Sequence, residues 1–489
     1  MNEVSETRII VLHASLVKKR SKSITKNEAY KPRHALSETR FDHMPDVVIG
    51  KIMSYLHWLE REWLVLAIPS MARIINSPLA WENFENDRTY PIDVLHMYYS
   101  VIVTRELIVI QRYGRYFQSC SIWLHSLVGA EECGDSDCLL LKAITENCTN
   151  LKLLSIMHPP DVTLTDFKST SSYYMKHIKS LAAKRGESFR LCLSRLFYSS
   201  VNTIATGIVS YLLYLQENDL LRHISCLDFS HGLVFDAQCA SYMFGLVNCE
   251  NISILKCPIH SVNTTIVLSM AKKKLKQLYL VNDDHTQEAG FLEKMYLDWE
   301  KISKELARKK KKKRFLMVHY IFRNRAMSHE DLHPNPLLHS LIFDNLSSNI
   351  SAKLLRRIAD QYGSTLRILA FCSNYWEFLM HFADLGEINE SFKYLGRNCV
   401  QLTAFLSCLS LPSSALVCLV MSSRSVSTVR VFKENVRLAT ADKPEGVFLL
   451  KMARALGLRK WDMVKKGANI FKIPNVDCRL LFATCFNEF

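Results

Sequence analysis

A short pattern of apolar residues recurs along most of the chain, with two residues and then one residue between its apolar positions. Weaker copies begin at Phe117 and Leu402, and residues 315–322 alternate in a similar way. Such short alternating runs predict one buried strand per copy. The clear copies are Leu151-x-x-Leu154-x-Ile156, Ile224-x-x-Leu227-x-Phe229, Ile252-x-x-Leu255-x-Cys257, Leu275-x-x-Leu278-x-Leu280, Leu338-x-x-Leu341-x-Phe343, Leu366-x-x-Leu369-x-Phe371 and Val426-x-x-Val429-x-Val431.

The copies follow one another at roughly regular intervals. Their central residues are 28 positions apart between Leu227 and Leu255, and 23 apart between Leu255 and Leu278. Helical segments, such as 137–146 and 289–307, lie between the copies. A strand that returns through a helix to the next strand predicts an α/β solenoid, with parallel strands inside and helices outside. An irregular α+β domain is the alternative architecture.

Three copies are preceded by the same dipeptide, Asn-Cys, at Cys148, Cys249 and Cys399. Asparagine suits the turn that ends a helix, and a thiol is small and easily buried. We therefore expect these cysteines to pack just before their strands. This arrangement resembles the cysteine-containing leucine-rich repeats of F-box proteins.

The N-terminal part carries a helical rather than a strand pattern. Pro45 suits the first helical position, and Asp46 would lie in the first turn, at the positive end of the helix dipole. Apolar residues at Met44, Val48, Ile52 and Leu56 follow at steps of four and predict one broad apolar helix face. Such a face must be buried against its own domain or a partner.

Residues 43–88 resemble an F-box, a domain of three helices. Pro45, Val48, Ile52 and Leu56 match consensus positions, and Trp81, preceded by Pro78, matches the closing tryptophan. The sequence departs from the family at Met44, where leucine is usual, at Val47, where an acidic residue is usual, and at Ala67, Ile68, Pro69 and Met71 in the middle helix. Pro69 is expected to break that helix. A small three-helix bundle without a partner is the alternative interpretation.

The predicted organisation is therefore a flexible basic leader (1–42), an F-box (43–90), a curved leucine-rich-repeat-like solenoid (91–437) and a C-terminal cap (438–489). Within the cap, residues 444–456 predict an amphipathic helix. The segment from Ile470 to Phe486 is apolar enough to cover the open edge of the last repeat. A solenoid end left bare would expose a hydrophobic layer.

The resemblance implies a substrate receptor of a Skp–cullin–F-box ubiquitin ligase, without catalytic residues, cofactor or metal of its own. Its partners would be the Skp adaptor, the cullin scaffold and a target protein that the sequence does not identify. A repeat scaffold that binds a protein partner without a ligase is the alternative function. The expected adaptor-binding residues are Met44, Pro45, Val48, Ile52, Leu56 and Trp81. The expected substrate-binding residues, placed between buried positions so as to point to solvent, are Ser155, Asp228, Tyr279, Ile342 and Ala370.

Charge adds one feature to this picture. The chain has 62 Lys and Arg against 47 Asp and Glu, a net charge of +15, and its basic residues form a run at 308–314. The run favours nuclear import or an acidic partner, although a solvated helix end would also place cations there. Nucleic-acid binding is not favoured, because no aromatic residues interleave with the lysines.

Other chemistry is scarce in the sequence. Phosphate-binding glycine loops and the Gly-x-Ser-x-Gly elbow are absent, and a zinc site built from His125, Cys133, Cys138 and Cys148 would lack paired knuckle spacing. The 15 cysteines include no Cys-x-x-Cys pair. This favours buried reduced thiols in a cytoplasmic or nuclear protein. No apolar run is long enough to span a membrane.

Overall fold

The structure is a computed structural model of the 489-residue chain. It describes residues 44–86, 92–123, 131–157, 176–194, 215–230, 243–283, 297–308, 316–323, 332–344, 351–372, 385–438, 445–458 and 461–463. The chain divides into two compact units, Met1–Leu79 and Ala80–Phe489. Each unit is described by itself.

The first unit contains short helices packed around a small core. These are α2 (Asp46–Ser54), α3 (Trp58–Ala67), the 3-10 turn η1 (Pro69–Met71) and α4 (Ala72–Ile75), followed by α5 (Pro78–Trp81), which crosses into the second unit. Pro45 is the N-cap of α2 rather than its first helical residue. Helix α3 ends two residues before Pro69, which confirms that this proline breaks the helix.

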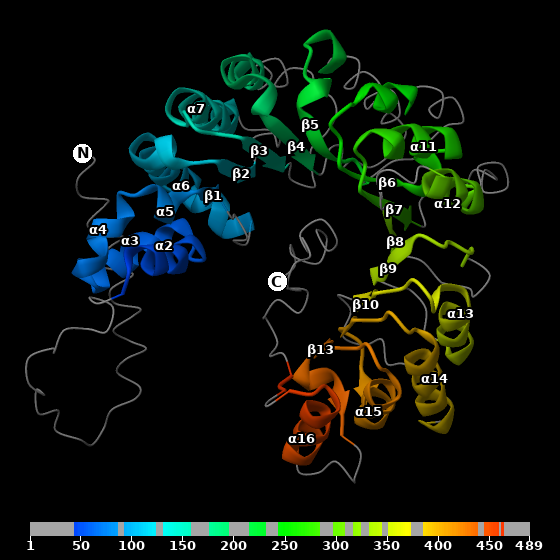
Figure 1. Ribbon diagram of the computed structural model, residues 1–489. Helices are drawn as coiled ribbons and strands as arrows, with labels where there is room; N and C mark the ends of the chain where they lie inside the picture. Colours follow the sequence, from blue (N-terminus) through cyan, green and yellow to red (C-terminus); the bar gives the residue numbers. More distant parts are fainter. Residues whose placement is uncertain are drawn as a thin grey trace, which may run out of the picture. The chain divides into compact units, whose positions relative to one another are not determined.

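The second unit is built on one sheet of 12 strands, which lie in the sheet in the order in which they occur along the chain and pair in parallel (Figure 1). A parallel sheet in chain order confirms the predicted α/β repeat architecture. The strands are β1 (Asn83–Glu85), β2 (Ser119–Trp123), β3 (Leu153–Met157), β4 (Arg190–Ser194), β5 (Ile224–Asp228), β6 (Ile254–Pro258), β7 (Gln277–Asp283), β8 (Met317–Arg323), β9 (Leu338–Asp344), β10 (Ile368–Cys372), β11 (Ala404–Ser407) and β13 (Thr428–Val431).

The helices of this unit lie on the outer side of the curved sheet, and the strands line its inner side (Figure 1). The described residues 176–185 are also helical. The α-helices with both ends described are α6 (Ile92–Tyr113), α7 (Glu131–Asn147), α11 (Thr264–Lys273), α12 (Trp299–Arg308), α13 (Ala352–Tyr362), α14 (Leu385–Asn398), α15 (Ser413–Ser422) and α16 (Glu445–Ala455). Short 3-10 turns are η2 (Gly114–Tyr116), η3 (Gly186–Ser188), η4 (Leu221–His223), η5 (Met243–Asn248), η6 (Ile259–Ser261) and η10 (Lys433–Asn435). A second sheet pairs β12 (Leu411–Pro412) with β14 (Val436–Arg437).

Strands β1 and β4 have no counterpart among the predicted copies. In β4 a polar residue, Ser188, occupies the first position of the pattern, so only the second and third positions, Leu191 and Leu193, are apolar. In β1 the pattern begins with Trp81 and Phe84 but ends on Asn86. Phe84 nonetheless pairs in register with Cys120 of β2, so β1 is the first strand of the repeat sheet.

The Asn-Cys dipeptides mark the approach to a strand, as expected. Cys148, Cys249 and Cys399 are all buried. The side-chain amide of Asn398 donates to the Tyr394 carbonyl at 2.9 Å, and the Cys399 N–H donates to the Leu395 carbonyl at 2.9 Å. Both bonds satisfy carbonyls at the end of α14, where no further helical N–H follows.

Serine and threonine hydroxyls extend the hydrogen bonding between neighbouring strands. Just before β6, Ser253 Oγ donates to the Ser225 carbonyl at 3.0 Å, and before β11, Thr403 Oγ1 donates to the Arg367 carbonyl at 3.1 Å. Each hydroxyl adds a further hydrogen bond to a carbonyl that already accepts one from a backbone N–H of the neighbouring segment.

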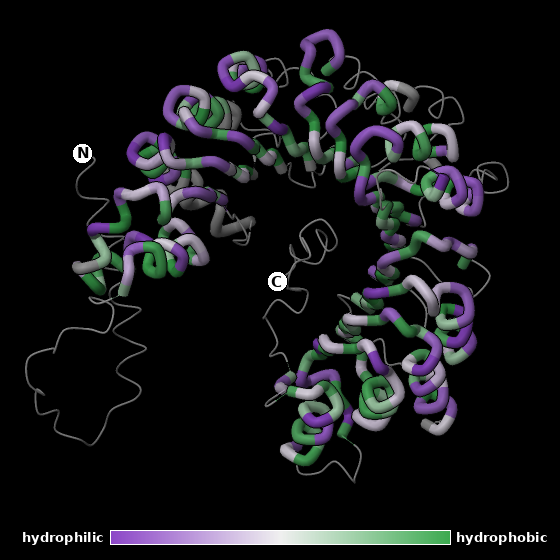
Figure 2. Tube along the Cα trace, in the orientation of Figure 1, coloured by the Kyte–Doolittle hydropathy of each residue, from purple (hydrophilic) through white to green (hydrophobic). Residues whose placement is uncertain are grey.

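The strands bury both of their faces. Hydrophobic positions are concentrated along them (Figure 2). Toward the helices lie residues such as Leu227, Leu255, Leu278 and Leu341. The opposite side, here called the inner face, carries the alternate residues: Cys226, Tyr279, Val281, Ile321, Ile342, Ile368, Ala370, Cys372, Ala404, Leu406 and Phe432 form one buried cluster there.

Candidate protein-interaction surfaces

Helix α2 presents apolar side chains to solvent in the first unit. Val47 is 67% exposed, Val48 44% and Tyr55, which directly follows the helix, 78%. Ile49 and Met53 point the other way and are buried. One side of this helix therefore holds the domain together while the other remains apolar and accessible.

The position of α2 is fixed at its N-terminal end and in its middle. Arg73 of α4 contacts the Asp46 carboxylate at 2.9 Å and donates to the Met44 carbonyl at 3.1 Å. In the middle of the helix, a Cβ atom added at Gly50 would lie 2.4 Å from Leu79 Cβ. Glycine therefore lets α2 approach Leu79 at backbone distance.

The predicted adaptor-binding residues fall into two groups. Pro45 and Val48 are exposed, and Met44, Ile52 and Leu56 are half-buried beside them. Val47 and Tyr55 belong to the same exposed side but were not predicted. Their spacing of eight positions, which is close to two helical turns, was the signal that could have identified them.

Trp81 does not belong to this surface, which corrects the prediction. Its side chain is fully buried in the second unit and stacks on Tyr113 with ring centroids 4.2 Å apart. Its ring also lies 6.2 Å from that of Phe117, the residue that holds the equivalent position before β2. Trp81 is thus the first apolar residue of a repeat.

The predicted substrate-binding residues do lie on the inner face, but they do not point to solvent. Asp228, Tyr279, Ile342 and Ala370 are each at most 1% exposed, and Ser155 is half-buried. The expectation of solvent exposure was wrong for these four residues, because the face that alternation identified is itself buried.

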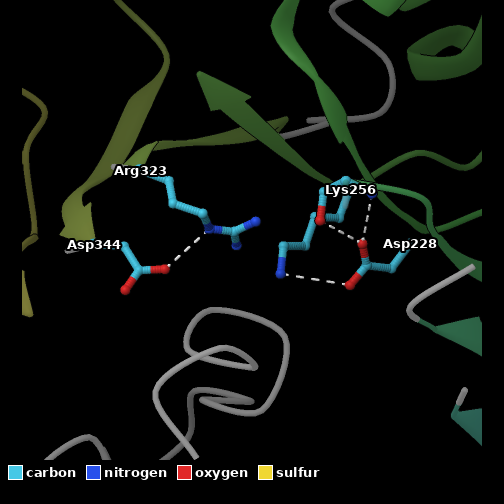
Figure 3. Close-up of polar contacts among 5 residues, drawn as sticks. Asp228, Lys256, Arg323 and Asp344 are labelled. Atoms are coloured by element: carbon cyan, nitrogen blue, oxygen red, sulfur yellow. Dashed lines mark hydrogen bonds and ion pairs between the residues drawn. The ribbon is translucent and has the colours of Figure 1, made fainter. Parts of the chain in front are cut away.

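Two ion pairs lie within the inner face (Figure 3). Lys256 Nζ is 3.5 Å from Asp228 Oδ2, and Asp228 Oδ1 also accepts hydrogen bonds from Ser230 N–H and Oγ, at 3.1 and 2.7 Å. Arg323 Nε lies 3.2 Å from Asp344 Oδ2. The four charged side chains are at most 7% exposed and sum to zero charge, so each buried cation has a carboxylate beside it.

A short polar row of aromatic and hydroxyl groups continues from Lys256 across β7 to β9, in register with it. His319 stacks on Tyr279 with ring centroids 4.1 Å apart. Ser340 Oγ lies 3.0 Å from Nδ1 of both His319 and His339, so the hydroxyl can donate to one ring and accept from the other. Burial lowers the pKa of His319 well below its usual value, and burial together with Arg367 lowers the pKa of His339 to about 4. Both imidazoles are neutral at pH 7.

Four buried thiols are poorly suited to nucleophilic chemistry. Burial raises the pKa of Cys148, Cys249, Cys257 and Cys399 to about 12, which keeps each thiol protonated. Among the residues that the structure describes, no cluster of three or more histidine, cysteine or acidic side chains could hold a metal ion. Cys133 and His125, considered for zinc, lie outside the part whose side chains are described, as do residues 309–314 of the basic run.

Within the described ranges, no helix is both long enough and apolar enough to cross a membrane.

Comparison with known proteins gives a weak likeness. No family model matches the sequence, and no curated protein matches it. Among solved structures, a chain from the crystal structure of the Rad7 and Elc1 complex in yeast is similar, with a TM-score of 0.41 and 13% sequence identity. The match covers 89% of this chain and 95% of that chain. A likeness at this level carries no argument about function.

Proposed function

We propose that the chain is the substrate-binding subunit of a ubiquitin ligase, which docks a Skp-type adaptor through the exposed side of α2. The exposure of Val47, Val48 and Tyr55 carries this proposal. An apolar cluster on a short, firmly held helix is a surface that a protein partner can cover. The resemblance of residues 43–88 to an F-box gives the partner its identity.

Under this proposal the chain contributes position rather than chemistry. The adaptor would connect the first unit to a cullin scaffold, and the repeat unit would hold the target protein. Holding both on one assembly raises the effective concentration of a target lysine near the ubiquitin-loaded enzyme. The proposal needs no catalytic residue or cofactor in the chain, and it places the chain in the cytoplasm or nucleus.

A repeat scaffold that binds a protein partner without a ligase is the second candidate. Two observations favour it: Pro69 interrupts the middle of the first unit, and Trp81, the residue matched to the closing tryptophan of an F-box, is buried in the repeats. Both reduce the surface that an adaptor could contact.

Binding of purified Skp adaptor to the full chain separates the two candidates. We expect the wild type to bind and the double variant Val47→Asp, Val48→Asp to bind at least tenfold more weakly, because two charges would be placed in an apolar interface. Aspartate is well tolerated in the first turn of a helix, so α2 should remain folded.

The control is Val400→Asp, which places one such charge at a residue that is 61% exposed in the second unit. It should bind the adaptor as the wild type does. If the wild type fails to bind, the scaffold function is correct. If the double variant binds as tightly as Val400→Asp, the adaptor surface has been misplaced.

A further inference from the structure

Four cysteines lie on the inner face as two cross-strand pairs. Cys192 of β4 is the register partner of Cys226 of β5. Cys226 and Cys372 belong to the inner-face cluster, and Cys192 and Cys408 pack against it. Cys226 is 4% and Cys372 1% exposed, whereas Cys192 and Cys408 are half-buried. One thiol of each pair is therefore buried, and solvent reaches the other.

The second pair follows from the pairing of β10 with β11. Phe371 is the register partner of Ser407, the last residue of β11. The Cys408 N–H continues the ladder, because it donates to the Phe371 carbonyl at 2.9 Å. Cys408 therefore lies opposite Cys372, the last residue of β10.

A register shift brings the first pair together. Leu191 is the register partner of Ile224, so an unbroken ladder would continue with Ser225 opposite the next residue of β4. The shift instead leaves Ser225 as an extra residue and places Cys192 opposite Cys226. Ser225 Oγ donates to the Leu191 carbonyl at 3.3 Å, which gives the extra residue a hydrogen bond of its own.

Both pairs meet the geometric requirement of a disulfide. Neighbouring strands lie roughly 4.8 Å apart, and the Cα atoms of a disulfide usually lie about 4.4 to 6.8 Å apart. The two side chains of each pair also project from the same side of the sheet, since all four contact the inner-face cluster. A disulfide can therefore form in each pair without separating the strands.

The difference in exposure assigns a role to each thiol. Cys192 or Cys408 meets an oxidant from solvent first, and its thiolate attacks a hydroperoxide. An S–O bond forms, the O–O bond breaks, and hydrogen peroxide loses one oxygen as water. The buried sulfur then attacks the sulfenic sulfur, so that an S–S bond forms, the S–O bond breaks and hydroxide leaves as water with the proton of the buried thiol. The two thiols lose two electrons, which the peroxide gains.

Two further thiols lie near each other but lack this access. Cys120 and Cys148 are both 0% exposed. Burial first and Cys148 second raise the pKa of Cys120, and burial raises the pKa of Cys148 to about 12. A hydroperoxide in solvent reaches neither of them as a thiolate. They provide an internal control for proximity without exposure.

We propose that Cys192–Cys226 and Cys372–Cys408 are two redox sites, at which a hydroperoxide converts the pair of thiols into a disulfide. Each disulfide fastens two neighbouring repeats covalently, β4 to β5 and β10 to β11. A small thiol such as glutathione reverses the step by thiol–disulfide exchange. This inference does not depend on adaptor binding.

Disulfide mapping after mild oxidation of the full chain tests the proposal. The wild type is treated with hydrogen peroxide, the remaining thiols are blocked with a maleimide, and unreduced peptides are analysed by mass spectrometry. We expect both disulfides to form at least roughly tenfold faster than any disulfide between Cys120 and Cys148, because only the proposed pairs expose a thiol. A sulfinic acid at Cys192 or Cys408, a disulfide from either to another cysteine, or equal rates overturns the proposal.

Two conservative variants serve as controls for each other. Cys192→Ser should lose the disulfide between β4 and β5 and keep the one between β10 and β11. Cys408→Ser should do the reverse. If a folded variant loses both disulfides or neither, oxidation does not take place within the two pairs.

Amide exchange of the wild type decides the matter even if a variant does not fold. In the oxidised chain β4, β5, β10 and β11 should exchange at least about threefold more slowly than in the reduced chain, and dithiothreitol should reverse the change. Strands β7 and β8 contain no cysteine and should exchange alike in both states. Equal exchange of all these strands in both states contradicts the proposal. The adaptor assay is read on the first unit, so failure of either proposal is distinguishable from failure of the other.

Discussion

Lys256 and Asp228 show what a charged pair requires in the interior of a repeat sheet. Their strands pair in register, so the two residues are direct neighbours on the inner face. Asp228 also accepts two hydrogen bonds from Ser230, which satisfy its second oxygen. A buried ion pair adds little net stability, but the loss of one partner leaves a charge without compensation in a dry environment.

The first prediction concerns this pair. Asp228→Ala should lower the free energy of unfolding by about 3–5 kcal/mol, because it removes the carboxylate that lies 3.5 Å from the buried Lys256 ammonium. The double variant Asp228→Ala, Lys256→Met should recover most of this loss, since both charges are removed together. Urea denaturation of the three proteins measures the difference. Equal destabilisation by the single and double variants would show that the pair is not coupled.

The two neutral histidines predict a dependence of stability on pH. The pKa of His339 is about 4 in the folded chain and that of His319 is also lowered, whereas an unfolded histidine titrates near 6.5. Below about pH 6.5 the unfolded chain therefore binds more protons than the folded chain, and stability falls as the pH falls. Each histidine contributes at most about 1.4 kcal/mol per pH unit in this window.

The variant His339→Gln provides the matched comparison, since glutamine can still exchange a hydrogen bond with Ser340. Between pH 7 and pH 5 we expect the variant to lose less stability than the wild type, by urea denaturation at each pH. The carboxylates titrate alike in both proteins, so they cancel in the difference. If the two proteins lose the same free energy of unfolding between pH 7 and pH 5, then His339 is protonated equally in the folded and unfolded chains.

At the scale of single elements, two glycines in helices have opposite surroundings. Gly50 of α2 faces Leu79 at backbone distance, whereas a Cβ added at Gly446 of α16 would meet no atom within 4 Å. Alanine normally stabilises a helix by roughly 1 kcal/mol relative to glycine, because it restricts the unfolded chain and favours helical dihedrals. The same substitution should therefore have opposite signs at the two positions.

We expect Gly446→Ala to raise the free energy of unfolding by about 0.5–1 kcal/mol and Gly50→Ala to lower it by about 1–3 kcal/mol, through overpacking. Thermal unfolding of the full chain, followed for each unit by amide exchange, measures both changes. If Gly50→Ala stabilises the first unit, then α2 can move away from Leu79 without cost.

The sequence predicts elements well where the repeat pattern is complete. Strands β5 to β7, β9 and β10 match their copies, because each of these copies supplies three apolar positions. Strand β4 lacks the first of these positions and β1 the last, where a buried Asn86 replaces an apolar residue. The same incompleteness explains the error at Trp81, which resembles an F-box residue but serves as the first apolar position of β1.

At the scale of the whole chain, the sequence predicts the order of strands but not what covers them. Regular spacing identifies parallel repeats, and alternation identifies which residues share a face. Alternation does not show whether a second layer covers that face, so Asp228 and Tyr279 were expected at the surface. The exposed side of α2 was predicted better, because its pattern contained more apolar positions than a small domain can bury.

In the sheet, each strand pairs only with the strands that precede and follow it in that sheet along the chain. Contacts of this kind let a repeat protein lose its end strands one at a time while the remainder stays folded. We therefore expect amide exchange under native conditions to be fastest in β1 and β13, which have one neighbouring strand each, and slower in the strands between them.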